Sequence, residues 1–136
     1  MTITRRIEID AGHRLLKHEG RCAHPHGHRY AFEVTVAPTA PLDAAGRVVD
    51  FGVVKELVGG WLDRAWDHAF IVQRGDPLET WLRDQRCRHY VLADPPSAEH
   101  LAACVFAQAQ VLLGGRLTVV RVRCYETPSC WADADG

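Results

Sequence analysis

The segment HGHRYAFEVTVA (residues 26–37) decides the fold prediction, because it carries the clearest strand pattern in the chain. Every second residue in its body is apolar: Tyr30, Phe32, Val34 and Val36. Side chains of equal parity point to the same side of a β-strand, so this pattern predicts a strand with one buried face. His26 and His28 share the parity of the apolar row, so both imidazoles extend that face at its N-terminal end.

Residues 3–13 have the alternation of a second strand. The apolar side chains Ile7, Ile9 and Ala11 alternate with Arg6, Glu8 and Asp10. His13 continues the apolar parity and stands at the C-terminal end of the row. If the two strands pair in one sheet, His13 converges with His26 and His28 at one end of the buried face.

Three converging histidines with an open fourth position are a typical ligand set of catalytic zinc. The alternative is a group of separately hydrogen-bonded histidines at strand ends. Cys22 lies four residues before His26. It is either a fourth ligand that closes a structural site, a reactive thiol beside the metal, or a free surface cysteine. His18 and His24 have no parity partner, so we expect both in loops.

Helices account for much of the remaining chain. Asp50 is the expected N-cap of a helix from residue 53 to about residue 65, where apolar residues follow helical spacing. A short helix is predicted over residues 76–84, and a second long helix begins after Ser97 and ends at Gly114–Gly115. Two further strands are expected, at residues 89–93 and 116–126. This order predicts an α+β fold with a mostly antiparallel sheet and the long helices on one face.

The last predicted strand ends in a carboxylate. One parity of this strand contains Thr118, Val120, Val122, Cys124 and Glu126, a row that we expect to be buried. A buried carboxylate is costly unless it is paired or bonded to a ligand. Its two oxygens match the adjacent N–H donors of a guanidine-like edge, which pterins and guanines possess. The alternative is that Glu126 is solvated in a turn before Pro128.

Asp67 and His68 follow the first long helix. Adjacent residues do not face each other on a helix, so a proton relay between them requires the helix to have ended. The alternative is a helix C-terminus with an exposed histidine on the helix dipole.

Composition limits the kind of protein. The chain has 136 residues, 47% of them hydrophobic and 24% charged, which suits a single domain spanning residues 1–136. A formal net charge of -1 gives no reason to expect nucleic acid or a membrane surface as partner. No apolar run approaches the roughly 18 residues of a membrane helix, and no export signal is evident. Five cysteines without a CxxC motif favour a reducing cytoplasm over a disulfide framework.

Six short motifs together resemble the family of 6-pyruvoyl-tetrahydropterin synthase and 6-carboxy-tetrahydropterin synthase. They occur in the family's order and extend over nearly the whole chain: AGHRL (11–15), C-x3-HGH (22–28), VVDFG (48–52), DHAF (67–70), PPSAEHLA (95–102) and YETPS (125–129). Each motif alone is weak evidence, whereas the ordered set is specific.

The resemblance implies a role for each matched residue. His13, His26 and His28 would bind zinc, and Cys22 would be the catalytic thiolate with Asp67 and His68 as its proton-relay partners. The pterin would be held by Glu126, Ser97, Ala98 and Glu99. The implied structure is the tunnelling fold, a four-stranded antiparallel sheet with two long helices on one face. Copies of the chain would form a homo-oligomeric barrel, expected as a hexamer with sites between subunits.

The position of Cys22, four residues before the first histidine of HGH, is similar to the 6-carboxy branch. The implied enzyme is a cytoplasmic, zinc-dependent lyase of 7-deazapurine (queuosine-type) biosynthesis. It would convert 7,8-dihydroneopterin triphosphate to 6-carboxy-5,6,7,8-tetrahydropterin, with release of acetaldehyde and triphosphate. A pyruvoyl-forming or side-chain-cleaving pterin enzyme is the alternative, and a structural zinc module closed by Cys22 is another.

The chain departs from the family pattern at three places: His100, His24–Pro25 and the tail SCWADADG. These departures bear on the choice of product. Arg14 and the basic segment RDQRCR (residues 83–88) are candidates for contacts with the triphosphate, with solvated surface as the alternative.

Overall fold

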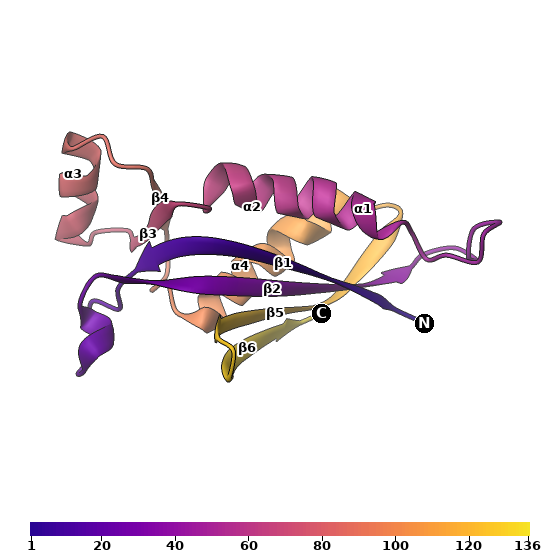
Figure 1. The fold of residues 1–136 in the computed structure, drawn as a ribbon, viewed down its shortest axis with the longest axis horizontal. Helices are drawn as coiled ribbons and strands as arrows, with labels where there is room; N and C mark the ends of the chain where they lie inside the picture. Colours follow the sequence, from indigo (N-terminus) through magenta and orange to yellow (C-terminus); the bar gives the residue numbers. More distant parts are fainter.

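A computed structural model describes residues 1–136, and its centre is a six-stranded sheet (Figure 1). The strand order is β4-β3-β1-β2-β5-β6. The strands are β1 (Ile3–His13), β2 (His26–Pro38), β3 (Ala69–Gln73), β4 (His89–Leu92), β5 (Leu117–Thr127) and β6 (Cys130–Asp135). The pairs β1–β2, β2–β5 and β5–β6 are antiparallel, whereas β3 runs parallel to both β1 and β4. The sheet is therefore mixed.

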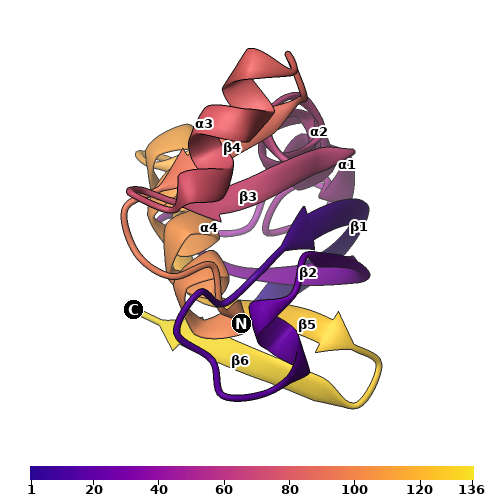
Figure 2. The same cartoon turned by 90° about the vertical axis from the view of Figure 1, so that its left-hand side faces the viewer.

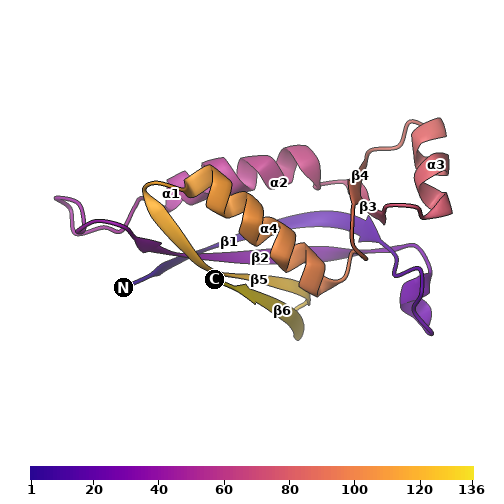
Figure 3. The same cartoon turned by 180° about the vertical axis from the view of Figure 1, so that it is seen from behind.

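Two long helical segments cover one face of this sheet. The first is α1 (Phe51–Val54), the π-helical turn η2 (Lys55–Gly59) and α2 (Gly60–Ala65) in direct succession, and the second is α4 (Ala98–Leu113). Figure 3 shows α4 crossing the sheet, and Figure 2 shows the strands curling around it. Two short elements complete the fold: the 3-10 turn η1 (Arg21–Ala23) and α3 (Pro77–Asp84). None of the helices combines the length and the apolar composition that crossing a bilayer requires.

The sheet and the two helical segments share one hydrophobic core, as strand parity and helical spacing predict. The β2 row predicted from the sequence is fully buried: Tyr30, Phe32, Val34 and Val36. The helices contribute Val54, Val58, Leu62, Trp66, Leu101, Ala102, Val105 and Ala109 to the same cluster. Because both helical segments bury their apolar sides against one sheet face, the predicted α+β arrangement is confirmed.

The four-stranded antiparallel sheet that the resemblance implied is wrong, because the sheet has two further strands and β3 runs parallel to its neighbours. Strand β3, AFIVQ, is short and runs parallel to both neighbours, and burial of side chains on both of its faces gives an apolar run without alternation. Strand β6, CWADAD, is mostly exposed, and its hydrogen bonds to β5 define it more than burial does. The strand expected at residues 89–93 exists as β4, but it pairs in parallel with β3.

A β-bulge corrects the parity predicted for the last strand. The β2–β5 register steps from Thr35↔Arg121 to Val36↔Val119, which leaves Val120 as an extra residue. An extra residue reverses which side chains face the core. Leu117 and Val119 are therefore buried before the bulge, and Thr118 is exposed. Beyond the bulge the predicted parity holds, with the core side chains Val122 and Cys124 leading to Glu126.

A buried ion pair fastens α3 to the end of β1. Arg14 donates from Nε to Asp76 Oδ2 at 2.8 Å and from Nη2 to Oδ1, and the Asp76 side chain is 1% exposed. Asp76 also caps α3 by accepting from the Leu78 amide at 2.8 Å. Arg14 is therefore engaged within the fold. The hydrogen bond from its guanidinium lowers the pKa of Asp76.

We expect Asp76→Asn to lower the free energy of unfolding by about 3 kcal/mol, because it leaves the Arg14 charge without its buried partner. The folded-state pKa of Asp76 is depressed, so the wild-type contribution is present above its unfolded value of about 4 and declines as the pH falls below it. Urea denaturation of both proteins between neutral and acidic pH measures the difference.

The matched control is Asp43→Asn, which removes the acid of an exposed pair with Arg47. Solvent and salt screen an exposed pair, so this variant should unfold almost as wild type does. Equal losses in the two variants would contradict a special role for the Asp76 pair.

Candidate metal and catalytic site

Three imidazoles meet where β1 ends and β2 begins. The register pairs His13 with His26 and Ala11 with His28. One candidate ligand atom from each histidine lies within 4.8 Å of the others, and no cysteine or carboxylate belongs to this group. His13 is fully buried, whereas His26 and His28 are partly buried. The convergence that strand parity predicted is confirmed.

Backbone carbonyls fix the orientation of two of the rings. His13 Nδ1 donates to the Pro96 carbonyl at 2.6 Å, and His26 Nδ1 donates to the His24 carbonyl at 2.6 Å. A carbonyl only accepts, so in the neutral rings each Nε2 keeps a lone pair. The two Nε2 atoms are 3.1 Å apart, and Nε2 of His28 is buried without a hydrogen-bond partner.

This donor set fits a divalent cation. Lone pairs that face each other repel unless a positive charge lies among them, and outer hydrogen bonds of this kind are typical of metal-binding histidines. Burial lowers the pKa of both His13 and His28, so protons are poor candidates for that charge. Imidazole nitrogen is a ligand that zinc accepts readily.

Glu126 of β5 lies beside the histidines. Its Oε1 is 3.6 Å from His28 Nε2, and its Oε2 is 4.0 Å from His13 Nε2. Its side chain is 24% exposed, so one side of the carboxylate remains accessible. The alternative in which Glu126 is solvated in a turn is wrong, because β5 continues to Thr127 and pairs with β6.

Cys22 lies in η1, the turn just before β2. It is partly buried, and its carbonyl accepts from the Leu15 amide at 2.7 Å, which ties the turn to the end of β1. Burial raises the pKa of the Tyr30 hydroxyl, and the Glu126 carboxylate raises it further.

Sequence reasoning gave Tyr30 a core position and no place in the site. Its ring centroid lies 5.7 Å from that of His13 and 5.4 Å from that of His28, so it forms the floor of the histidine cluster. Its hydroxyl is buried without a hydrogen-bond partner. Tyr30 shares strand parity with His26 and His28, and this is the sequence signal that could have placed it in the site.

The segment Ser97–Glu99 opens α4 next to the same cluster. Ser97 caps the helix by accepting from the His100 amide, and its hydroxyl is 3.3 Å from His100 Nδ1. The pKa of Glu99 is lowered by its own backbone N–H and by the Ser97 hydroxyl. The unusual His100 thus supports the helix cap. Ala98 is the first residue of the helix.

Asp67 and His68 contact each other, because α2 has ended at Ala65. Asp67 Oδ2 lies 3.1 Å from His68 Nδ1, and Asp67 Oδ1 accepts from the Asp10 amide at 3.0 Å. His68 has a φ of 58°, a left-handed conformation, and its side chain is 74% exposed. Partial burial acts to raise the pKa of Asp67, but its hydrogen bonds with Asp10 and His68 outweigh this, so the pKa is lowered.

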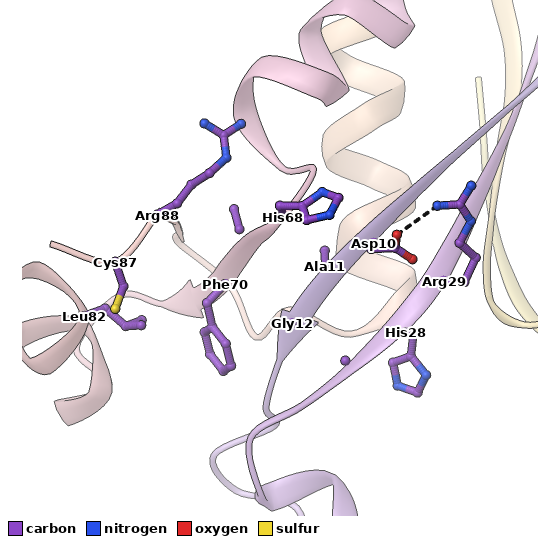
Figure 4. A pocket seen from close by; sticks show the side chains of 12 residues that line it. Asp10, Ala11, Gly12, His28, Arg29, His68, Phe70, Leu82, Cys87 and Arg88 are labelled. Carbon is purple, nitrogen blue, oxygen red and sulfur yellow. Dashed lines mark hydrogen bonds and ion pairs between the residues drawn. The ribbon is translucent and has the colours of Figure 1, made fainter. Parts of the chain in front are cut away.

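His68 borders a hollow of about 710 Å³ at the ends of β1 and β2 (Figure 4). Phe70 forms part of its wall. A Cβ on Gly12 would lie 2.8 Å from the Phe70 ring, so only glycine lets that ring lie against β1. Further lining residues are Asp10, Arg29, Leu82, Cys87 and Arg88. Neither Asp67 nor His68 forms a hydrogen bond or ion pair with Cys22, Glu126 or the three histidines, although His28 and His68 both line this hollow.

The comparisons with known proteins point to one enzyme family, and the matches extend over nearly the whole chain. A sequence model of the 6-pyruvoyl tetrahydropterin synthase family matches residues 2–136. The 6-carboxy-5,6,7,8-tetrahydropterin synthase of Rickettsia bellii is 36% identical over 137 residues and covers 96% of each chain. A probable 6-carboxy-5,6,7,8-tetrahydropterin synthase of Halobacterium salinarum is 38% identical over 130 residues, which are 94% of this chain and 82% of that protein.

Solved structures share the fold. An uncharacterized protein from Wolinella succinogenes superposes with a TM-score of 0.84 at 20% identity, covering 100% of this chain and 98% of the other. The 6-pyruvoyl tetrahydropterin synthase of Caenorhabditis elegans gives 0.73 at 21% identity, with coverages of 100% and 95%. The family match and the named relatives show that the chain is an enzyme of the lyase class. It belongs to the 6-pyruvoyl tetrahydropterin synthase family.

We expect the purified protein to hold about one divalent metal ion per chain, and His26→Ala to lose most of it, because one of three ligands is removed. Elemental analysis after dialysis measures the content. His24→Ala is the matched control, since only the backbone carbonyl of His24 takes part in the site. A His26→Ala protein that retained the metal would contradict the assignment.

Proposed function

We propose that this protein is a zinc-dependent lyase that converts 7,8-dihydroneopterin triphosphate to 6-carboxy-5,6,7,8-tetrahydropterin, releasing acetaldehyde and triphosphate. The observation that carries the proposal is the convergence of three histidines beside Glu126 at the end of the core. Support comes from the relatives named 6-carboxy-5,6,7,8-tetrahydropterin synthase, which match nearly the full chain at 36 and 38% identity.

His13, His26 and His28 would hold the zinc through nitrogen, and the ligand group contains no cysteine. Three protein ligands are typical of catalytic zinc, whereas structural sites usually have four. This supports the catalytic interpretation over a structural zinc module closed by Cys22. Bound zinc would supply Lewis acidity to the hydroxyl and carbonyl oxygens of the substrate side chain.

The chain's own residues would bind the pterin and move its protons. The Glu126 carboxylate would accept two hydrogen bonds from the guanidine-like edge of the ring, a geometry in which both oxygens are used. Ser97, Ala98 and Glu99, at the N-terminus of α4, would contact the same ring. The Cys22 thiolate would remove a proton from a carbon of the substrate side chain.

Asp67 and His68 would exchange a proton with the opposite side of the substrate. The contact between Asp67 Oδ2 and His68 Nδ1 leaves Nε2 of the exposed imidazole available for this transfer. The lowered pKa of Asp67 keeps its carboxylate ionised, so it orients the ring throughout the cycle. In chemical terms the pair is suited to act as a proton relay.

Two features of a single chain support sites formed between subunits. First, the relay forms no hydrogen bond or ion pair with the histidine cluster within one chain. Second, the sheet has free edges: β1 pairs with β3 only through Ala11–His13, and β6 ends the sheet on the other side. Free edges pair readily with another copy. We propose a homo-oligomeric barrel, expected as a hexamer, in which Asp67 and His68 of one subunit serve the pterin held by its neighbour.

The identity of the product is the most specific part of the proposal. The spacing of Cys22 to HGH favours the 6-carboxy product over the 6-pyruvoyl product, and with it a place in 7-deazapurine (queuosine-type) biosynthesis. Five free cysteines support a reducing compartment such as the cytoplasm.

Incubation of the zinc-loaded protein with 7,8-dihydroneopterin triphosphate tests the activity. We expect acetaldehyde, triphosphate and the 6-carboxy product in equal amounts, measured by liquid chromatography and an acetaldehyde assay. A 6-pyruvoyl product would overturn the branch assignment, and the absence of any conversion would overturn the proposed function.

Cys22→Ala should reduce kcat by about 10²- to 10⁴-fold, because it removes the proposed general base, while the metal content stays at the wild-type value. Steady-state kinetics and elemental analysis measure the two quantities. The exposed Cys130 provides the control Cys130→Ala, which should keep full activity. Loss of metal from Cys22→Ala, or a zinc–sulfur shell in X-ray absorption of the resting enzyme, would move Cys22 into the ligand set.

A further inference from the structure

We propose that Arg88 is a positioning residue that holds the Asp67–His68 turn in the conformation that joins the two side chains. This inference rests on the proposed function for its effect on turnover, and on geometry alone for its effect on the turn. Arg88 lies between α3 and β4, in the basic segment that was a candidate for triphosphate contacts. Figure 4 places it on the wall of the hollow that His68 borders.

The Arg88 guanidinium is committed to backbone carbonyls. Nε donates to the Asp67 carbonyl at 2.9 Å, and Nη2 donates to the carbonyls of Asp63 at 2.8 Å and Arg64 at 2.6 Å. The last carbonyls of a helix have no partner within the helix, and a cation there also interacts favourably with the helix dipole. The Arg88 side chain therefore donates to the last carbonyls of α2 and also to the carbonyl of Asp67 in the turn that follows.

The same residue holds the far side of the turn through its backbone. The Arg88 carbonyl accepts from the Phe70 amide at 3.0 Å, so side chain and main chain together grip residues 67–70. From the opposite side, the Asp10 amide donates to Asp67 Oδ1 at 3.0 Å, and the Asp10 carbonyl accepts from the His68 amide at 2.7 Å. The turn is thus clamped between β1 and the residue that leads into β4.

These hydrogen bonds matter because the turn is strained. His68 has a φ of 58°, in the left-handed region that is unfavourable for a non-glycine residue. That conformation lets adjacent side chains meet, with Asp67 Oδ2 3.1 Å from His68 Nδ1. Without the bond from Arg88 to the Asp67 carbonyl, we expect the turn to relax and the contact to be lost for part of the time.

Other charges around the Asp67 carboxylate stay in place when Arg88 changes. Arg29 of β2 pairs with Asp10 at 3.0 Å and also contributes to the lowered pKa of Asp67. His68 is the remaining titratable contact of Asp67. A change in the pH dependence of turnover in an Arg88 variant therefore reports on the Asp67–His68 contact.

The test compares Arg88→Gln and Arg88→Lys with wild type in the zinc-loaded, assembled enzyme. We expect Arg88→Gln to lower kcat by about tenfold to a hundredfold, as loss of orientation typically does, with KM and zinc content unchanged. The acid limb of the kcat profile should move to higher pH, because Asp67 loses part of its hydrogen bonding. Amide exchange measured by mass spectrometry should accelerate in residues 67–70. Arg88→Lys keeps the charge without the planar fork and should fall between the two.

Arg47→Gln is the matched control, because Arg47 is exposed, lies in the loop before α1, and its side chain pairs only with Asp43 and Asp50. It should leave kcat, the pH profile and the exchange of residues 67–70 unchanged. Wild-type kcat and wild-type exchange in Arg88→Gln would overturn the proposal. If Arg88→Gln does not fold, wild-type values in Arg88→Lys would overturn it as well. If wild type converts no substrate, the proposed function fails, and the exchange measurement alone still decides whether Arg88 holds the turn.

Discussion

The antiparallel register of β1 and β2 is the constraint on which the rest of the site depends. It sets His13 opposite His26 and brings His28 opposite Ala11, so three imidazoles gather at the end of one apolar row. A shift of one residue would turn the side chains of one strand to the other face and separate the ligands. The buried row of β2 fixes this register, because the same side chains form the core under both helical segments. Stability and metal site are therefore specified by one pattern.

The polar groups around the cluster come from parts of the chain that are distant in sequence. The Pro96 carbonyl orients His13 across 83 positions, and β5 carries Glu126 alongside both strands. The proposed relay is built in the same way, since Asp10 and Arg88 hold the turn of Asp67 and His68 from two sides. The side chains of His13 and Asp67 are thus each held by a backbone group of a distant segment. Such support restricts reactive groups to the geometry that their chemistry needs.

Much of the fold was predictable, and the errors have distinct physical causes. Alternation identified β1 and β2, and caps at Asp50 and Ser97 marked where the long helices begin. Strand β3 was missed because it is short and buries side chains on both faces, which removes the alternation, and β6 because it buries little. The parity error in β5 came from the bulge at Val120, which no local pattern announces. The two basic candidates for phosphate contacts, Arg14 and Arg88, have partners within the fold.

The sequence by itself determined the three histidines on one face, the glutamate that ends the β5 row and the family to which the motifs belong. These depend on residue type and on the period of a strand, which are local properties. Only the tertiary structure decided that Tyr30 packs against the histidine cluster, that His24 acts through its carbonyl, and that Asp67 and His68 form no hydrogen bond with that cluster within one chain. Those features depend on which distant segments pair and on where a chain turns, and no local spacing encodes either.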